Sequence, residues 1–134
     1  MRRLFAVLAL VTLAACGSDT STNPNNEAVE GTYSLHTVNG QPLPYTVQGN
    51  GVTIVLTSDV LTVKSDGSWN ETITYRQTVS GGATTNEADA DAGSWTRVAN
   101  TITFESSAVG AFEGTYAKGT VTFDDPGFLA VFKR

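Results

Sequence analysis

The chain has 134 residues, with 8 basic and 13 acidic side chains, a formal net charge of −5 and 40% hydrophobic residues. This length suits a single domain. The acidic balance excludes nucleic acids and anionic lipid headgroups as natural partners, because both select clusters of Lys and Arg.

The N-terminal residues have the order of a secretory signal. Arg2 and Arg3 supply positive charge, and the apolar run Leu4 to Leu13 follows them. A run of this length is too short to anchor a chain stably across a bilayer. The pattern therefore predicts a signal peptide over residues 1–15 that is removed on export.

The four residues Leu13-Ala14-Ala15-Cys16 end this segment. They resemble the lipobox of bacterial lipoproteins, which implies that Cys16 becomes the first mature residue and carries a diacylglyceryl thioether. The same resemblance implies a further acyl chain, such as palmitate, on the freed amine. Two or more acyl chains anchor a protein firmly, because each buried methylene contributes about 0.8 kcal/mol. The alternative is a plain secreted protein whose cysteine has no such role.

Residues 16–28 are predicted to be the lipidated cysteine and a flexible tether, because they are polar, include Pro24 and bury almost nothing. Cys16 is the only cysteine, so we expect no disulfide and no thiolate metal site. In enteric lipoproteins, an Asp directly after the lipidated cysteine retains the protein in the inner membrane. This chain has Gly17 at that position. The resemblance therefore implies a lipid-anchored protein of the cell envelope, at the outer membrane and facing the periplasm.

From residue 29 to residue 134 the hydrophobic pattern has period two. Apolar and polar side chains alternate around residues 33–36, 52–57, 61–64, 69–76, 101–105 and 120–124. This alternation is typical of strands with one buried and one solvated face. Short turns are predicted at Asn39-Gly40, Asp66-Gly67, Ala99-Asn100, Lys118-Gly119 and Pro126-Gly127. Two longer connections are expected, over residues 39–51 and 79–92.

These elements predict an all-β domain of eight or nine strands in an antiparallel up-and-down β-barrel, since closure removes exposed sheet edges. The opening Gly31-Thr32-Tyr33-Ser34-Leu35 resembles the first strand of the lipocalin and wider calycin group. The segment Val38-Asn39-Gly40-Gln41-Pro42-Leu43-Pro44 is similar to small bacterial lipoproteins with a lipocalin-like domain. The resemblance implies a calyx for an apolar ligand, although the chain lacks the disulfides and the helix of secreted lipocalins.

The phase of the alternation predicts which side chains point inward: Tyr33, Leu35, Ile54, Leu56, Leu61, Val63, Trp69, Ile73, Tyr75, Trp95, Ile102, Phe104, Phe112, Tyr116, Val121, Phe123, Phe128 and Phe132. An eight-stranded barrel is either filled by such side chains or holds one small ligand, and both alternatives stay open.

If a cavity exists, we expect five aromatic side chains to surround its ligand: Trp69, Tyr75, Trp95, Phe104 and Tyr116. Glu71 and Arg97 share the inward phase of the two tryptophans. They are predicted either to form an interior ion pair or to orient a polar group of the ligand.

Catalysis has little support in the sequence. There is no Gly-x-Ser-x-Gly elbow or phosphate-binding glycine loop, and the single histidine, His36, falls in a polar phase. The segment Glu87-Ala88-Asp89-Ala90-Asp91 lacks the glycine and glutamate spacing of an EF-hand, so a solvated acidic loop is favoured over a calcium site. We therefore expect a protein that is not an enzyme and needs no metal or cofactor.

Two functions are favoured over a third class, an enzyme of the envelope. The first is a membrane-anchored lipoprotein whose lipocalin-like domain binds or carries a small hydrophobic ligand. The alternative is a non-enzymatic structural or interaction module with a filled barrel, which engages an envelope protein through its loops. Pro42-Leu43-Pro44-Tyr45 would then be an apolar docking segment or would simply close one end of the barrel.

Overall fold

The computed structural model describes residues 27–134, which form ten antiparallel strands. The predicted signal peptide, Cys16 and nearly all of the predicted tether lie outside these residues. The strands are β1 (Gly31–Val38), β2 (Gln41–Pro42), β3 (Tyr45–Gly49), β4 (Val52–Val63), β5 (Ser68–Val79), β6 (Thr84–Val98), β7 (Thr101–Ser106), β8 (Gly110–Ala117), β9 (Thr120–Asp125) and β10 (Phe128–Lys133).

Eight of these strands close into a barrel. From β4 to β10 each strand pairs with the next, and β1 joins the two ends of this series by pairing with both β10 and β4. Residues 31–34 of β1 pair with residues 60–63 of β4, while Ser34 to Val38 pair with β10. The predicted all-β antiparallel up-and-down barrel is confirmed, and β2 and β3 are short additions to it.

The tight turns follow from residue types that tolerate a left-handed backbone. Asn39 and Gly40 have φ of 50° and 76°, and Lys118 and Gly119 have φ of 48° and 75°. Two central residues with positive φ make the hairpin turn whose twist matches that of the flanking strands. The predicted turns between β1 and β2 and between β8 and β9 are thus confirmed.

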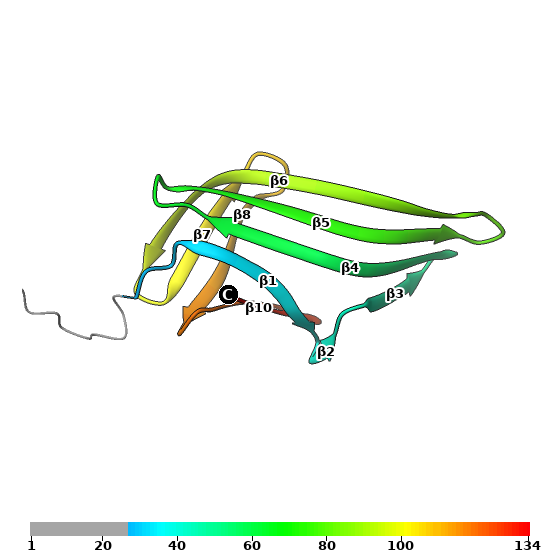
Figure 1. Ribbon diagram of the computed structural model, residues 1–134, viewed down its shortest axis with the longest axis horizontal. Coiled ribbons are helices and arrows are strands. Elements are labelled where there is room, and N and C mark those ends of the chain that lie inside the picture. Colours follow the sequence, from blue (N-terminus) through cyan, green and yellow to red (C-terminus); the bar gives the residue numbers. More distant parts are fainter. Residues whose placement is uncertain (1–26) are drawn as a thin grey trace, which may run out of the picture.

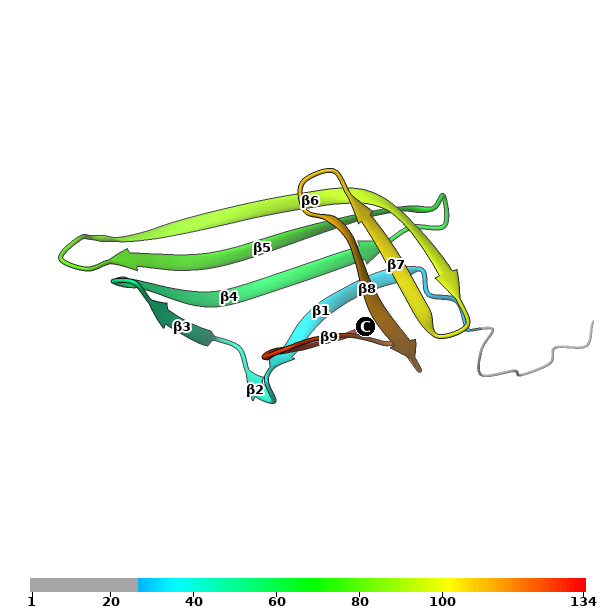
Figure 2. The same cartoon turned by 180° about the vertical axis from the view of Figure 1, so that it is seen from behind.

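The long strands β4, β5 and β6 extend past the barrel. Figure 1 shows this extension as a twisted ribbon that projects to the right, with β3 along one of its sides. Seen from behind, β7 and β8 run at a steep angle to β4 and β5 (Figure 2). Because β7 pairs with β6 only from Gly93 onward, the backbone of residues 84–92 of β6 pairs with β5 alone.

The predicted long connections were wrong, because both contain strands. β5 continues to Val79 and β6 begins at Thr84, so the expected loop over residues 79–92 is mostly a hairpin of the extension. Residues 39–51 hold β2 and β3. Pairing with a neighbouring strand forms these segments: residues 84–92 pair with β5, and β3 pairs with β4.

Most of the predicted interior is confirmed. Ten of its members are buried: Tyr33, Leu35, Leu61, Val63, Trp69, Ile102, Phe104, Tyr116, Val121 and Phe132. Val29, Val38 and Ala130 are also buried, and the pattern did not predict them. Phe128 is the main correction, since 46% of its surface is exposed at the β9–β10 turn.

A β-bulge in β4 keeps both halves of this strand in phase with the interior. The register with β5 shifts between Leu56 and Ser58, so Leu56 pairs with Tyr75 while Asp59 pairs with Ile73. An extra residue in one strand allows side chains an odd number of positions apart to share a face. The bulge therefore turns Asp59 inward, on the same side as Leu56, Leu61 and Val63.

Candidate functional site

The two ends of the barrel differ. We call the end where residues 27–30 join β1 the N-terminal end; it carries the turns at residues 64–67, 99–100 and 118–119. We call the opposite end, with the turns at residues 107–109 and 126–127, the mouth. The extension of β3–β6 also leaves the barrel on the side of the mouth (Figure 1).

The N-terminal end is sealed by the chain itself. The Tyr33 hydroxyl donates to the carbonyl of Val29, and the Tyr116 hydroxyl donates to the carbonyl of Ala28 at 3.0 Å. Arg134 donates to the carbonyls of Ala28 and Glu30 at 3.1 Å each, and to the Tyr116 hydroxyl at 2.9 Å. These bonds hold residues 28–30 across this end of the barrel, over the buried core.

Arg97 reinforces the same seal. Its guanidinium donates to the carbonyl of Glu27 at 2.6 Å and lies 5.0 Å from the centre of the Tyr116 ring. A guanidinium at this distance from an aromatic face is attracted by the quadrupole of the ring. Arg97 therefore serves the N-terminal end.

The mouth is hollow. A cavity of about 630 Å³ lies there, within the 300–1,000 Å³ typical of small-molecule sites. Its walls come from β4, β5, β6, β8, β9 and β10 and from the β7–β8 turn. Its apolar lining consists of Ile73, Ala90, Ala108, Val109, Phe112, Phe123, Phe128, Ala130 and Phe132.

The inner end of the cavity is formed by phenylalanines that pack on the buried aromatic core. Phe112 stacks on the buried Phe104 with ring centres 5.3 Å apart and meets Trp69 edge-on at 5.5 Å. Phe123 contacts Phe112 at 5.7 Å and Phe132 at 5.6 Å. Such pairs contribute about 0.5–1.5 kcal/mol beyond area burial, so the phenylalanines are held in place by their neighbours.

Carboxyl groups line the other side of the cavity: Asp59, Glu71, Asp89, Asp91 and Asp125. Ladder register explains their convergence, because residues directly opposite each other share a face of the sheet. Glu71 of β5 pairs with Asp91 of β6, and Ile73 pairs with both Asp59 of β4 and Asp89 of β6.

Asp91 is satisfied by the wall of the cavity. Its two carboxylate oxygens accept bonds from the buried Ser106 hydroxyl at 2.9 and 2.7 Å. The Ser106 oxygen in turn accepts bonds from the backbone N–H groups of Ala108 and Val109 at 3.0 and 3.1 Å. This chain of bonds fixes the β7–β8 turn at the rim of the mouth.

Asp59 is not satisfied in this way. Only 8% of its surface is exposed, and its Oδ1 atom has no hydrogen-bond partner. Burial, together with the adjacent Glu71 carboxyl, raises the pKa of Asp59 to about 8. Burial also raises the pKa of Glu71. Asp59 therefore retains a proton at neutral pH, because its charged form is poorly solvated.

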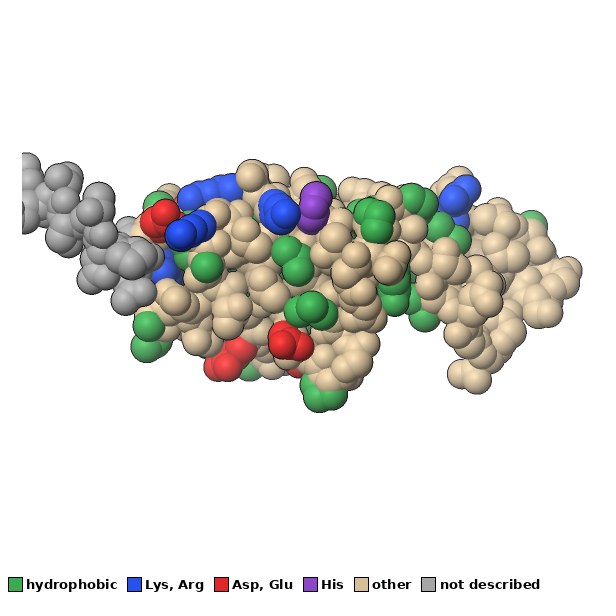
Figure 3. All heavy atoms as spheres, turned by 90° about the horizontal axis from the view of Figure 1, so that it is seen from below, with side chains coloured by type: hydrophobic (Ala, Val, Ile, Leu, Met, Phe, Trp, Pro, Cys, Tyr) green, Lys and Arg blue, Asp and Glu red, His purple; other side chains and the backbone are tan. Residues whose placement is uncertain are grey.

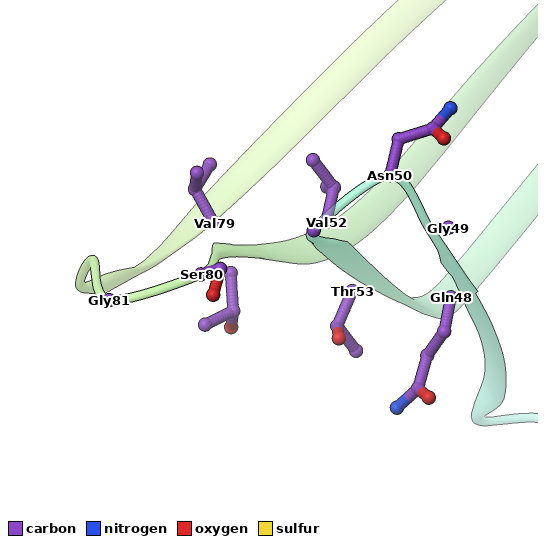
Figure 4. Close-up of a pocket in the computed structure, with 10 residues that line it drawn as sticks. Gln48, Gly49, Asn50, Val52, Thr53, Val79, Ser80 and Gly81 are labelled. Atoms are coloured by element: carbon purple, nitrogen blue, oxygen red, sulfur yellow. The ribbon is translucent and has the colours of Figure 1, made fainter.

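A second depression, of about 430 Å³, lies at the far tip of the extension. Figure 4 shows that its residues do not converge: Val52 and Val79 point to one side of the ribbon, and Gln48 and Thr53 to the other. None of the residues that line it is charged. It therefore lacks the directed polar groups of a binding site.

The five aromatic residues expected around a ligand lie outside this cavity lining. Trp69, Phe104 and Tyr116 are fully buried in the packed half of the barrel. Trp95 donates from Nε1 to the carbonyl of Lys64 at the N-terminal end, at 2.9 Å. Tyr75 stands on the extension, where its hydroxyl donates to Asp89 at 3.1 Å. The structure does not bring these five together.

The expected pair of Glu71 and Arg97 does not form. Both side chains have the inward phase, but Glu71 pairs in register with Asp91, which precedes Arg97 by six residues on β6. At the rise of a strand this separates them by about 20 Å. Glu71 therefore belongs to the carboxyl group of the mouth and Arg97 to the seal.

Sequence reasoning missed Asp59 and the inward carboxylates of β6. The phase that placed Trp95 and Arg97 inside would, if continued backward by twos, have placed Asp91 and Asp89 inside too. That signal was available, but the acidic segment was interpreted as a loop. Asp59 had the same signal, because it lies two residues before the inward Leu61, and the odd spacing between inward Leu56 and inward Leu61 indicates the bulge.

Comparisons with protein families, with curated proteins and with solved structures found no significant match to this chain. Within residues 27–134 no helix has the length and apolar character needed to cross a membrane. The same residues contain no group of three or more His, Cys, Asp and Glu side chains arranged to hold a metal ion.

Proposed function

We propose that this chain is a lipid-anchored protein of the bacterial envelope whose lipocalin-like barrel holds one small hydrophobic ligand in the cavity at its mouth. The observation that carries the proposal is the division of the barrel into a packed half and a hollow half. The cavity has the volume of a small-molecule site and a lining rich in phenylalanine.

Anchoring is proposed from the lipobox-like residues that end in Cys16, with outer-membrane placement following from Gly17. The geometry is compatible with it, because residues 27–30 join the barrel at the end opposite the cavity. A tether attached there leaves the mouth free to exchange ligand. Metabolic labelling with radioactive palmitate should mark the wild-type chain and leave the variant Cys16→Ser unlabelled; equal labelling of both would contradict the anchor.

Ligand holding is tested with the neutral fluorescent probe N-phenyl-1-naphthylamine and residues 17–134, secreted without acyl chains. This segment contains every strand and all of the buried core, so we expect it to fold alone. The probe should bind saturably with increased emission. No response at any concentration would contradict the proposal.

The variant Ala130→Leu tests whether the probe binds in the cavity. Ala130 is buried and lines the cavity, so three added carbons occupy the space that a ligand would take. We expect at least tenfold weaker probe binding, with the fold retained. The matched control is Ala117→Leu, on the exposed outer surface of β8, which should bind the probe like the wild type.

The second candidate is an interaction module without a ligand. The observation that favours it is the extension, where residues 84–92 of β6 leave one backbone edge unpaired and Val47 and Val79 are about half exposed. Charged side chains are scarce over this right-hand end of the molecule in Figure 3. Such an edge can add a strand from another protein. Absence of probe binding would shift support to this candidate. Neither candidate involves catalysis.

A further inference from the structure

We propose that the cavity at the mouth selects a cationic amphiphile, with an organic ammonium group between Asp59 and Glu71 and an apolar body against the phenylalanines. This inference rests on the proposed ligand-holding function and adds the chemical class of the ligand. Four observations support it.

The first observation is an unsatisfied buried acceptor. Asp59 is more than nine-tenths buried, it lines the cavity, and its Oδ1 atom accepts no hydrogen bond. Buried polar atoms are nearly always paired in native proteins, so an orphan at the wall of a cavity indicates a missing donor. Glu71 lies beside it on the neighbouring strand, where a donor with several N–H groups could reach both carboxyls.

The second observation is the charge of the lining. Carboxyls face the cavity from four strands: Asp59 on β4, Glu71 on β5, Asp89 and Asp91 on β6 and Asp125 on β9. None of the residues that line it is Lys, Arg or His. Asp91 accepts hydrogen bonds from Ser106 and Asp89 accepts one from Tyr75, and both of these donors are neutral. A cavity lined by several carboxyls and by no basic side chain attracts a positive group.

The third observation is the proton already held there. Asp59 lines the cavity beside Glu71, and burial raises its pKa to about 8, so Asp59 keeps a proton at neutral pH in the empty site. An ammonium group that enters would replace this proton as the compensating charge. Ligand binding is then expected to release protons to the solvent.

The fourth observation is the apolar wall opposite. Phe112, Phe123, Phe128 and Phe132 present aromatic surface to the same cavity. Aromatic rings bury the apolar part of a ligand, and their faces attract an ammonium group. A bare metal ion would gain nothing from this wall, and the described carboxyls include no cluster of three arranged for one. The site therefore fits an organic cation with a hydrophobic body.

The test compares three ligands of equal chain length: decylammonium, 1-decanol and decanoate. Each displaces N-phenyl-1-naphthylamine from residues 17–134 at pH 7. We expect decylammonium to bind at least tenfold more tightly than decanol, because hydrogen bonds to charged partners are the strong ones, and decanoate to bind most weakly. Calorimetry in buffers of different ionisation enthalpy should show proton release with decylammonium alone.

The double variant Asp59→Asn with Glu71→Gln should remove the preference for decylammonium and leave decanol binding unchanged. Retained decanol binding also reports that the variant is folded. The matched control is Asp124→Asn, on the outward face of β9 beside the cavity residues, which should keep the preference. Equal affinity of the unmodified protein for decylammonium and decanol overturns this inference but leaves the proposed function intact. Failure of every ligand and of the probe contradicts the proposed function itself.

Discussion

Asp59 has the least favourable environment of the carboxyl groups described here. It is buried beside Glu71, one of its oxygens lacks a donor, and its pKa rises to about 8 from an ordinary value of 3.8. The folded protein therefore binds a proton that the unfolded chain releases between pH 4 and pH 8. Since the folded state binds more protons over this window, the free energy of unfolding should fall as the pH rises through it.

The substitution Asp59→Asn tests this linkage. It removes a charge that the folded state solvates poorly, so we expect the free energy of unfolding at pH 8 to increase by about 1–3 kcal/mol. At pH 4 the carboxyl is protonated in the folded state and only partly ionised in the unfolded chain, so the gain should be small. Urea unfolding of residues 17–134 at both pH values measures the effect, with Asp124→Asn as the exposed control. An equal loss of stability at pH 4 and pH 8 would contradict the assignment.

Tyr116 is a second residue with a clear energetic role. Its buried hydroxyl donates to Ala28 and accepts bonds from Arg134 and Gly119. Tyr116→Phe leaves these partners without the hydroxyl and should lower the free energy of unfolding by about 1–2 kcal/mol. Tyr45→Phe is the matched control, because the Tyr45 hydroxyl accepts one bond from the exposed Asn39 amide. Equal effects of the two changes in a urea titration would argue against the seal.

Single residues were predictable where one face of a strand is wholly apolar. Tyr33, Leu61 and Phe104 were placed inside by alternation alone, and each is buried. Asp59 was missed although it lies two residues before the inward Leu61, because carboxyl side chains were expected in turns and on outward faces. Hydrogen-bond partners such as Ala28 for Tyr116 could not be predicted from the sequence either, since the two residues are 88 positions apart.

At the scale of elements, β6 is the strand on which the two halves of the barrel depend. Its second half pairs with β7 and carries Trp95 and Arg97 toward the N-terminal end. Its first half carries the inward Asp89 and Asp91 past the mouth. Gly93 lies between these halves, where the pairing with β7 begins.

A glycine at position 93 allows β6 to begin pairing with β7 here, because the backbone of β7 comes very close to it. A methyl group on Gly93 would overlap the carbonyl oxygen of Glu105 and would lie 3.0 Å from the indole nitrogen of Trp69. Gly93→Ala must therefore displace β7 or Trp69, and we expect a loss of more than about 3 kcal/mol in the free energy of unfolding. Thermal unfolding followed by tryptophan fluorescence measures it.

The control for that substitution is Gly49→Ala on β3, where no atom lies within 4 Å of the added carbon. It should change the free energy of unfolding by less than about 0.5 kcal/mol. If Gly93→Ala changes the free energy of unfolding as little as Gly49→Ala does, β6 and β7 do not approach each other closely at Gly93.

Elements were predictable where turns and alternation agree. The hairpin at Lys118-Gly119 joins two alternating runs, and both the strands and the turn are present. The hairpin over residues 79–92 was missed for a physical reason. Its residues are mostly Gly, Ala, Thr, Asn and acids, which favour no strand by themselves, and they pair because β5 continues beside them.

At the scale of the whole molecule, one end of the barrel is filled and the other is hollow. The N-terminal end holds the packed aromatic core and the seal formed by Tyr33, Tyr116 and Arg134. The mouth holds the cavity of about 630 Å³. The sequence left open a filled barrel and a hollow one, and each of these possibilities describes one half of the barrel.

This division explains why the sequence predicted the barrel but not the site. Closure needs only strands of suitable number and phase, which alternation records. A cavity depends on where neighbouring side chains fail to meet. Here that depends on the position of the β7–β8 turn and on the small side chain of Ala130, neither of which has a periodic signal.

Native mass spectrometry of residues 17–134 recovered from the periplasm tests most directly whether the mouth holds a ligand. We expect the wild-type segment to carry an additional mass that organic extraction removes, and Ala130→Leu to carry much less of it. The chemical class of that mass should include a cationic nitrogen. A ligand-free mass for both proteins, with no binding of N-phenyl-1-naphthylamine, would contradict the proposal and direct the search to protein partners of the extension.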